Sequence, residues 1–292
     1  MCCTQKRFDA CYGSNIEHYI LAKNIHSCFF ESISFNSQTK LKIEPMCDLF
    51  ALSATKDYSA PEFLPLFAVQ AKKNMDGWGI GFFRKHQALV EKSADQVFYG
   101  GQLHDSFQRL ARVVKSRIIL CHIRLRTSGL VDECHAHPFV LTFGGHNWIF
   151  AHNGKAPAIE SYQSRSTTIE DAISDSARAF EYLRDQIEYH HQHHAEPNML
   201  FKILADSTSQ MIDQYPGNYN YLLTNGHLLF AFTNHRQFMV MKGSRKLKGA
   251  LLLTTLARGL SKERWLRVAK ATNRKGLLLA ISGNDVIIHK SI

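Results

Sequence analysis

From Met46 onward, short runs of apolar residues separated by polar and glycine residues predict a chain of strands with helices grouped near its middle. Alternating or continuous apolar runs predict strands, and apolar residues three and four positions apart predict helices. The predicted strands are 47–53, 79–83, 117–126, 139–143, 147–152, 219–224, 228–233, 238–241, 251–254, 276–281 and 285–289. The predicted helices are 61–73, 103–115, 168–190 and 197–214.

Helix and turn signals agree with this division. Pro197 stands at the start of a predicted helix, and Pro216-Gly217 follows its end. Asn225-Gly226 and Gly283-Asn284 lie between predicted strands and are typical of hairpin turns. Hairpins with helices grouped between them favour a layered α+β fold over a doubly wound fold, in which strands and helices would alternate.

Residues 1–45 have a looser pattern than the rest, with few periodic apolar positions and a polar stretch before Pro45. We therefore expect 1–45 to be an N-terminal extension and 46–292 to be one domain. The first 30 residues lack the apolar core of a secretory signal, and no run approaches the roughly 20 residues of a membrane span. These features predict a cytoplasmic protein with reduced cysteines. The irregular spacing of Cys2, Cys3, Cys11 and Cys28 does not suit zinc ligands.

The basic residues are unevenly distributed along the chain. The 292 residues are 45% hydrophobic and 21% charged, which is typical of a globular chain and excludes general disorder. The net charge is +10, and the segment 236–275 alone holds twelve basic residues against the single acid Glu263. A solvated basic face is the favoured interpretation, because no nucleic-acid-binding motif accompanies the charge. A polyanion-binding surface remains the alternative.

Polar and glycine residues gather at the ends of several predicted strands. They form six stretches: MCDLF at 46–50, DGWGIG at 76–81, HIRLRTSG at 122–129, HPF at 137–139, FAHNG at 150–154 and SDS at 174–176. Each is weak alone. The glycines of 76–81, for example, lack the βαβ unit of a nucleotide-binding loop.

In this order and spacing, the six stretches resemble those of the class II glutamine amidotransferases, the cysteine branch of the N-terminal nucleophile (Ntn) hydrolases. The resemblance covers about residues 46–292 and points to the small stand-alone members. It implies a four-layer αββα sandwich of two mainly antiparallel sheets between helices. It also implies cleavage of the γ-amide of glutamine with no metal or organic cofactor, and a separate ammonia-accepting synthase as a possible partner.

The resemblance assigns the chemistry to Cys47, whose thiol would attack the carboxamide to form a γ-glutamyl thioester. In this family the α-amine of an N-terminal cysteine, with a reference pKa of about 7.7–8, serves as the general base. The side-chain amide of Asn153 and the backbone N–H of Gly154 would stabilise the oxyanion.

Substrate-binding residues follow from the same resemblance. Arg124 would bind the α-carboxylate with its two-donor fork, and Thr127 would add a hydrogen bond. Asp175 would accept from the α-ammonium group, although a solvated Asp on a helix is the alternative for that residue. Trp78 and Gly79 are expected to shape the pocket.

The chain departs from the family pattern because residues precede Cys47, so that its nitrogen is an amide and cannot be the base. Translation from Met46 with removal of that Met, cleavage of a propeptide, or a non-catalytic relative would each explain this. The loose pattern of 1–45 and the position of Met46 favour the first. Met1-Cys2 could also expose a cysteine, but no apolar strand follows it. Further departures at Ser128, His135 and Ala177 bear on the substrate.

Two alternatives to glutamine hydrolysis remain. One keeps the chemistry but takes another γ-glutamyl amide, and the other is a catalytically silent binding protein that uses the basic segment. A cluster formed by His190, His191, His193 and His194 is interpreted as the solvated end of a helix, since no carboxylate completes a metal site.

Overall fold

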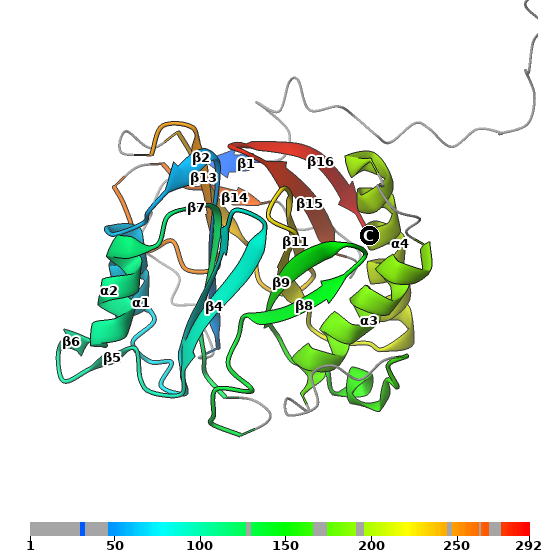
Figure 1. The fold of residues 1–292 in the computed structure, drawn as a ribbon, viewed down its shortest axis with the longest axis horizontal. Coiled ribbons are helices and arrows are strands. Elements are labelled where there is room, and N and C mark those ends of the chain that lie inside the picture. Colours follow the sequence, from blue (N-terminus) through cyan, green and yellow to red (C-terminus); the bar gives the residue numbers. More distant parts are fainter. Residues whose placement is uncertain are drawn as a thin grey trace, which may run out of the picture.

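The computed structural model describes residues 30–32, 46–126, 130–165, 174–190, 196–243, 247–262, 264–268 and 276–292. Two antiparallel sheets face each other, with helices on their outer faces, as the resemblance implied (Figure 1). From left to right, Figure 1 shows α1 and α2, the first sheet, the second sheet, and then α3 and α4.

The first sheet has eight strands in the order β1-β14-β12-β13-β2-β7-β3-β4, and every neighbouring pair is antiparallel. Strand β2 lies inside this sheet and begins one residue after Cys47. The strands are β1 Phe30–Ser32, β2 Asp48–Tyr58, β3 Trp78–Arg84, β4 Gln87–Ser93, β7 Ser116–Ile123, β12 Met239–Lys242, β13 Ala250–Thr254 and β14 Leu266–Val268.

The second sheet has six strands in the order β16-β15-β11-β10-β9-β8, again all antiparallel. These are β8 Phe139–Phe143, β9 His146–Asn153, β10 Asn220–Thr224, β11 Leu229–Thr233, β15 Leu277–Ser282 and β16 Asp285–Ser291. A small hairpin pairs β5 Phe98–Tyr99 with β6 Gln102–Leu103.

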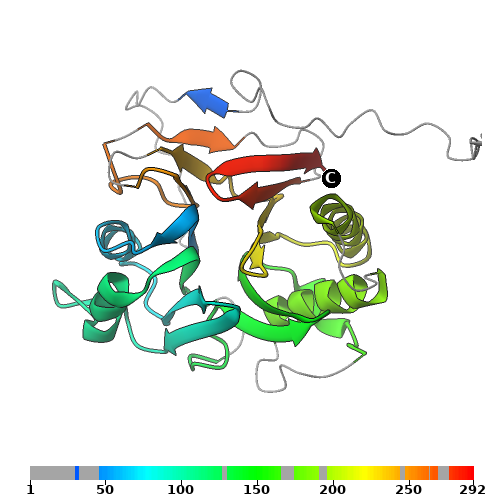
Figure 2. The ribbon, with the colours of Figure 1, turned by 45° about the horizontal axis from the view of Figure 1, so that its top comes forward.

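Helices α1 (Phe63–Gln70) and α2 (Asp105–Val113) cover the first sheet, and α3 (Asp175–His190) and α4 (Pro197–Gln214) cover the second. Figure 2 shows the same arrangement from a second direction. A short 3₁₀ helix spans Pro157–Ser161. One apolar core lies between α1, α2 and the first sheet, a second between α3, α4 and the second sheet, and a third between the two sheets. Each sheet is therefore packed on both of its faces. None of the helices in the described ranges is long and apolar enough to span a membrane.

The sequence pattern found the main elements but missed β4 and several very short strands. Strand β4 (87–93) lies at the edge of the first sheet and is partly exposed, so its residues do not form a clear pattern of apolar and polar positions. Strands β1, β5, β6 and β14 have only two or three residues, too few to form a pattern. The expected helix over 168–190 is described only from residue 175, because 166–173 lie outside the described residues.

Antiparallel pairing gives the sandwich two distinct ends. Cys47 precedes β2, and the chain leaves β7 and β9 at this same end, through Arg124 and Asn153. Hairpin turns after β3, β8, β10 and β15 lie at the opposite end. Residues separated by more than 100 positions in sequence are therefore brought together at the Cys47 end.

Candidate active site

The thiol of Cys47 lies against the chain that continues from β7. Its Sγ donates to the carbonyl of Leu125 at 3.1 Å, and the backbone N–H of Leu125 donates to Sγ at 3.3 Å. Burial is the main reason that the pKa of this thiol is raised to about 11. While Cys47 is held within the chain, its thiol therefore stays protonated at neutral pH.

Asn153 and Gly154 reach Cys47 from the end of β9. The buried Asn153 side chain donates from Nδ2 to the carbonyl oxygen of Cys47. An added Cβ at Gly154 would lie 1.8 Å from the carbonyl oxygen of Asn218, so no larger residue fits without displacing the backbone. The backbone that follows β9 is thus fixed close to the nucleophile candidate.

Arg124 is positioned by backbone hydrogen bonds on both sides. Its N–H donates to Gly77 at 2.8 Å, and its carbonyl accepts from Asp76 at 3.1 Å. The side chain is buried, and Nη1 donates to the carbonyl of Leu130 at 2.6 Å. Two connected loops therefore hold the guanidinium at the end of the first sheet.

Asp175 is the first residue of α3 and is buried rather than solvated. Its Oδ2 accepts from the backbone N–H of Ala156 at 2.8 Å, and its Oδ1 accepts from that of Ser176 at 2.7 Å. The carboxylate thus ties the start of α3 to the loop that follows Gly154.

These groups meet in one small pocket. Its lining comprises Cys47, His122, Arg124, Leu125, His135, His137, His152, Gly154, Ser174, Asp175 and Ser176. Four of the predicted catalytic and substrate-binding residues therefore line the same space, although they come from the starts or ends of β2, β7, β9 and α3. Asn153 is connected to this pocket by its hydrogen bond to the carbonyl oxygen of Cys47.

Three buried histidines line the pocket and were not anticipated from the sequence. His137 Nδ1 and His122 Nε2 are 3.2 Å apart, and His152 Nδ1 is 2.8 Å from the hydroxyl of Ser176. Burial lowers the pKa of each imidazole, to about 3 for His122. The three rings are therefore neutral at neutral pH. The HIRLRTSG, HPF and FAHNG stretches contained all three, but no role was assigned to the histidines in them.

The remaining candidates lie elsewhere. The Trp78 ring packs edge-on against Phe107, 5.2 Å between centroids, in the core beneath α2 and apart from the pocket. Gly79 lies behind the pocket wall, where an added Cβ would be 2.2 Å from the carbonyl oxygen of His137. Thr127 and Ser128 lie outside the described residues. Of the two other departures from the family pattern, His135 lines the pocket and Ala177 is buried in α3.

A polar network around the start of β2 was also missed. Arg236 donates from Nη1 to the carbonyl of Cys47 at 3.0 Å, and its Nη2 lies 2.8 Å from Asp48 Oδ1. Asn74 and Thr255 donate to the same buried carboxylate at 3.0 and 3.1 Å. Arg236 lies shortly after the end of β11, as Arg124 lies directly after the end of β7. From the sequence it was counted only as one of the basic residues of 236–275.

The basic segment is thus not uniformly solvated. Arg236 turns inward to Asp48, and Lys242 forms an ion pair with Asp285. Residues 244–246, 263 and 269–275 lie outside the described part, so the segment is only partly seen. In the histidine cluster, His190 is exposed and the other three lie outside that part too. The described residues contain no group of three metal-ligating side chains arranged to hold an ion.

Comparison with known proteins agrees with this fold. The family model described as "Glutamine amidotransferases class-II" matches residues 46–248. The chain therefore belongs to the class II glutamine amidotransferases.

Curated relatives match only in part. A putative glutamine amidotransferase from Haemophilus influenzae is 25% identical over 57% of this chain and 55% of its own length. A gamma-glutamyl-hercynylcysteine sulfoxide hydrolase from Mycobacterium tuberculosis H37Rv is 31% identical over 48% of this chain and 58% of its own. The matched stretch thus spans little more than half the length of these relatives.

Solved structures share the fold at low identity. A predicted glutamine amidotransferase from Pseudomonas aeruginosa PA01 has a TM-score of 0.56 at 18% identity, covering 82% of this chain and 99% of the other. Glutamine phosphoribosylpyrophosphate amidotransferase from B. subtilis has a TM-score of 0.55 at 16% identity, covering 84% of this chain and 49% of the other.

Proposed function

We propose that this protein cleaves the γ-amide of glutamine, or of a related γ-glutamyl compound, through a thioester on Cys47. The observation that carries the proposal is the pocket that Cys47 shares with Arg124, Gly154 and Asp175. A thiol, a cation and a carboxylate around one small space match an amino acid that has an electrophilic side chain and a charged head at its other end.

The nucleophile needs a general base, and the described residues around the Cys47 thiol do not supply one. The raised pKa of the Cys47 thiol leaves almost no thiolate at neutral pH, and the buried histidines are neutral but engaged with each other or with Ser176 and Asn218. A free α-amine on Cys47 would titrate at about 7.7–8 and take the proton near neutral pH. The active form is therefore proposed to begin at Cys47, with residues 1–46 absent.

Oxyanion stabilisation requires Asn153 to change partner. Its Nδ2 donates to the carbonyl of Cys47, which also accepts from Arg236. Because Arg236 can hold that carbonyl alone, the Asn153 amide is free to turn to the substrate oxyanion beside the N–H of Gly154. Loss of one such donor typically lowers the rate by about 10²–10³-fold.

The head of the substrate is proposed to bind between Arg124 and Asp175. The Arg124 guanidinium presents two parallel donors to the α-carboxylate. Asp175 accepts from the backbone N–H groups of Ala156 and Ser176 and from the Ser176 hydroxyl, and as a buried carboxylate in the pocket wall it is the proposed counter-charge for the α-ammonium group. Thr127 is proposed to add its hydrogen bond here.

The reaction releases ammonia as well as glutamate. A separate ammonia-accepting synthase is the proposed partner, and the mechanism calls for no cofactor. We place the amidotransferase domain at residues 46–292 and the protein in the cytoplasm. Strand β1, from the extension, pairs with β14 at the edge of the first sheet, at the periphery of that domain.

A γ-glutamyl amide other than glutamine is the second candidate substrate. One relative carries the name of a γ-glutamyl compound hydrolase, and His135 lines the pocket of this chain with its Nδ1 2.7 Å from Asp132. Comparing kcat/KM for glutamine and a series of γ-glutamyl amides separates the two. A bulky amide preferred by tenfold or more would move the assignment to the second class.

The test of the proposal is glutamate release by the protein that begins at residue 47 and by its Cys47→Ala variant, with exposed Cys134→Ala as the matched control. Cys47→Ala should abolish release and Cys134→Ala should leave it unchanged. Normal turnover in Cys47→Ala would overturn the thioester mechanism. No release by any form, with strong salt-dependent retention on a polyanion, would favour the silent binding protein instead.

A further inference from the structure

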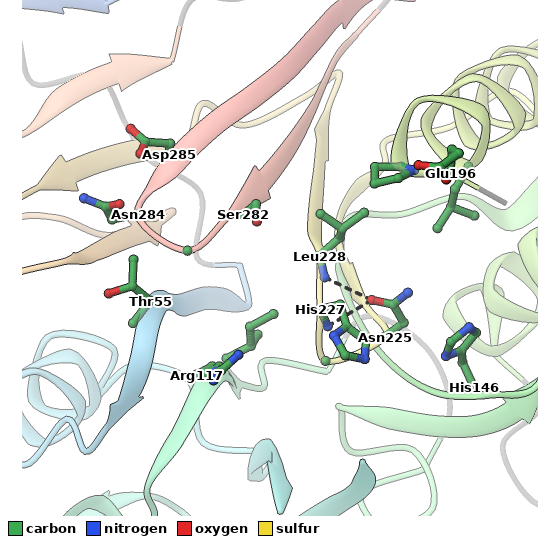
Figure 3. Close-up of a pocket in the computed structure, with 16 residues that line it drawn as sticks. Thr55, Arg117, His146, Glu196, Asn225, His227, Leu228, Ser282, Asn284 and Asp285 are labelled. Atoms are coloured by element: carbon green, nitrogen blue, oxygen red, sulfur yellow. Dashed lines mark hydrogen bonds between the residues drawn. The ribbon is translucent and has the colours of Figure 1, made fainter. Parts of the chain in front are cut away.

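Two adjoining pockets lie at the end of the sandwich opposite Cys47. Their volumes are about 730 and 990 Å³, and they share Arg117, Asn225, Gly226 and His227. Figure 3 shows Thr55 and Arg117 from the first sheet across from Asn225, His227 and His146 of the second. Volumes of about 300–1,000 Å³ are typical of small-molecule sites.

The walls of this hollow are fixed to one another. The carbonyl of His86, in the β3–β4 turn, accepts from Asn147 Nδ2 at 3.1 Å. An ideal Cβ on Gly226 would be 2.9 Å from the Phe83 ring, and one on Gly283 would be 3.0 Å from Thr55 Cγ2. Four hairpin tips are thus packed or bonded to their neighbours, so the hollow is preformed.

Cations outnumber acids on the larger pocket. Five basic residues line it, against Asp57 and Glu91, and they are Lys56, Arg84, Lys85, Lys115 and Arg117. All five are exposed, and none forms an ion pair with another residue of the described chain. This charge is separate from the basic segment 236–275.

A histidine also lies at each of three of these hairpin tips. The His86 and His227 rings lie 5.8 Å apart between centroids, and His146 and His227 lie 6.4 Å apart. Within the described chain these rings do not form a metal-holding group, and the neighbouring cations oppose a metal ion. Imidazole N–H groups beside Arg and Lys are instead donors for an anion.

Lys85 adds a backbone observation. Its φ of 57° makes it the one residue other than glycine with a positive φ in the described chain. A left-handed conformation is unfavourable for a residue with a Cβ, and glycine would remove the strain. Lys85 is the first residue of the two-residue β3–β4 turn, whose geometry calls for a positive φ and favours glycine, so the lysine places its charge beside the hollow at some cost in backbone strain.

We propose that this end of the sandwich binds a phosphate group. Arg117 supplies a planar two-donor fork, Lys85 and Lys115 supply point charges, and His227 supplies an N–H. The site is independent of the thiol chemistry, since it lies at the other end of the strands. The phosphate could belong to a soluble phosphomonoester or to a nucleic-acid backbone, which share this recognition.

The first experiment measures the binding of inorganic phosphate to the full chain by calorimetry. Arg117→Gln should weaken binding by at least about tenfold, because charge-assisted hydrogen bonds are lost. Arg112→Gln, on the exposed face of α2, is the matched control and should bind as wild type does. In the form that begins at Cys47, glutamate release should be the same in both variants. No phosphate binding by wild type, or equal affinities in the two variants, would overturn the proposal.

Lys85→Gly separates binding from folding. The substitution removes a charge and relieves the positive φ, so phosphate affinity should fall several-fold while the Tm stays level or rises. An unchanged affinity would remove Lys85 from the site.

The source of the phosphate is identified by titrating a ribose 5-phosphate probe and a single-stranded oligonucleotide in parallel. Displacement of either probe by phosphate supports the site, and the probe that binds more tightly identifies the source of the phosphate group. Binding of either probe that survives both Arg117→Gln and excess phosphate would place it elsewhere and contradict the proposal.

Discussion

At the scale of single residues, Arg236 is the main addition that the structure makes to the candidate site. It contacts the Cys47 carbonyl and the Asp48 carboxylate, on the two sides of one peptide bond. The six sequence stretches located Cys47, Arg124, Gly154 and Asp175, because family motifs preserve residue types in order. Arg236, Asn74 and Thr255 stand outside those stretches and join the site only through strand pairing, which a single sequence does not display.

Replacing Arg236 tests its role as a positioning residue. In Arg236→Gln, Asn153 must keep holding the Cys47 carbonyl, so kcat should fall by about 10²-fold while KM changes little. The buried Asp48 loses its cation, which should lower the free energy of unfolding by about 3 kcal/mol. Steady-state kinetics and urea titration measure both, with exposed Arg258→Gln as the control. A rise in KM with unchanged kcat would contradict the positioning role.

Arg124→Lys tests recognition of the substrate head. A lysine keeps the charge but lacks the two-donor fork, so kcat/KM for glutamine should fall by about tenfold to a hundredfold. Most of the loss should be in KM. Arg126→Lys is the matched control, since Arg126 is exposed and two positions away. Equal kinetics for the two variants would exclude Arg124 from carboxylate binding.

At the scale of elements, the hydrophobic pattern predicted what the strands bury but not how their ends meet. Strand β2 was predicted as 47–53 and extends to Tyr58, because its last residues are partly exposed and break the apolar run. Strand β7 was predicted to 126 and ends at Ile123. Its last predicted residues, 124–126, instead form the loop that contacts Cys47.

The close approach of β3 to the pocket wall gives an element-scale prediction. Gly79→Ala would place a Cβ 2.2 Å from the His137 carbonyl oxygen, so the backbone beside His122 and His137 must shift. The free energy of unfolding should fall by about 3 kcal/mol or more, and activity should fall with it.

The matched control is Gly145→Ala in the β8–β9 turn. Its φ is 74° and nothing lies within 4 Å of the added Cβ, so only the backbone strain of about 1–2 kcal/mol is expected. If Gly145→Ala proved the more damaging of the two, the packing argument for Gly79 would be wrong.

At the scale of the whole molecule, the layered αββα architecture was predictable because the motif order implied it. The hairpin count and helix grouping alone favoured only a layered α+β fold. The division at residue 46 stays a prediction, and strand β1 shows that a short piece of the extension pairs with the first sheet. The far-end pockets could not be predicted, because four separate turns form them.

Stability should depend on pH through the three buried histidines. Their folded pKa values lie below the unfolded value of about 6.5, so the unfolded chain binds more protons below that pH. Their contribution is fully present above pH 6.5 and is lost as the pH falls toward the folded values. Each histidine contributes a slope of up to about 1.4 kcal/mol per pH unit.

Urea titrations at pH 7.5, 6, 5 and 4.5 measure this dependence. His122→Asn should reduce the slope between pH 6 and 4.5, whereas exposed His190→Asn should not. A stability that is flat over this range in wild type would mean that the histidines are not held neutral.

The central claim is that Cys47 becomes the nucleophile once it is the first residue. The most direct measurement is peptide mass spectrometry of the protein purified from its native source, after incubation with a glutamine-like electrophile such as a γ-chloroketone analogue. The account predicts one adduct, on a peptide that begins at Cys47 with a free α-amine. An adduct on any other cysteine, or an unmodified Cys47 still joined to Met46 in a preparation that releases glutamate, would contradict it.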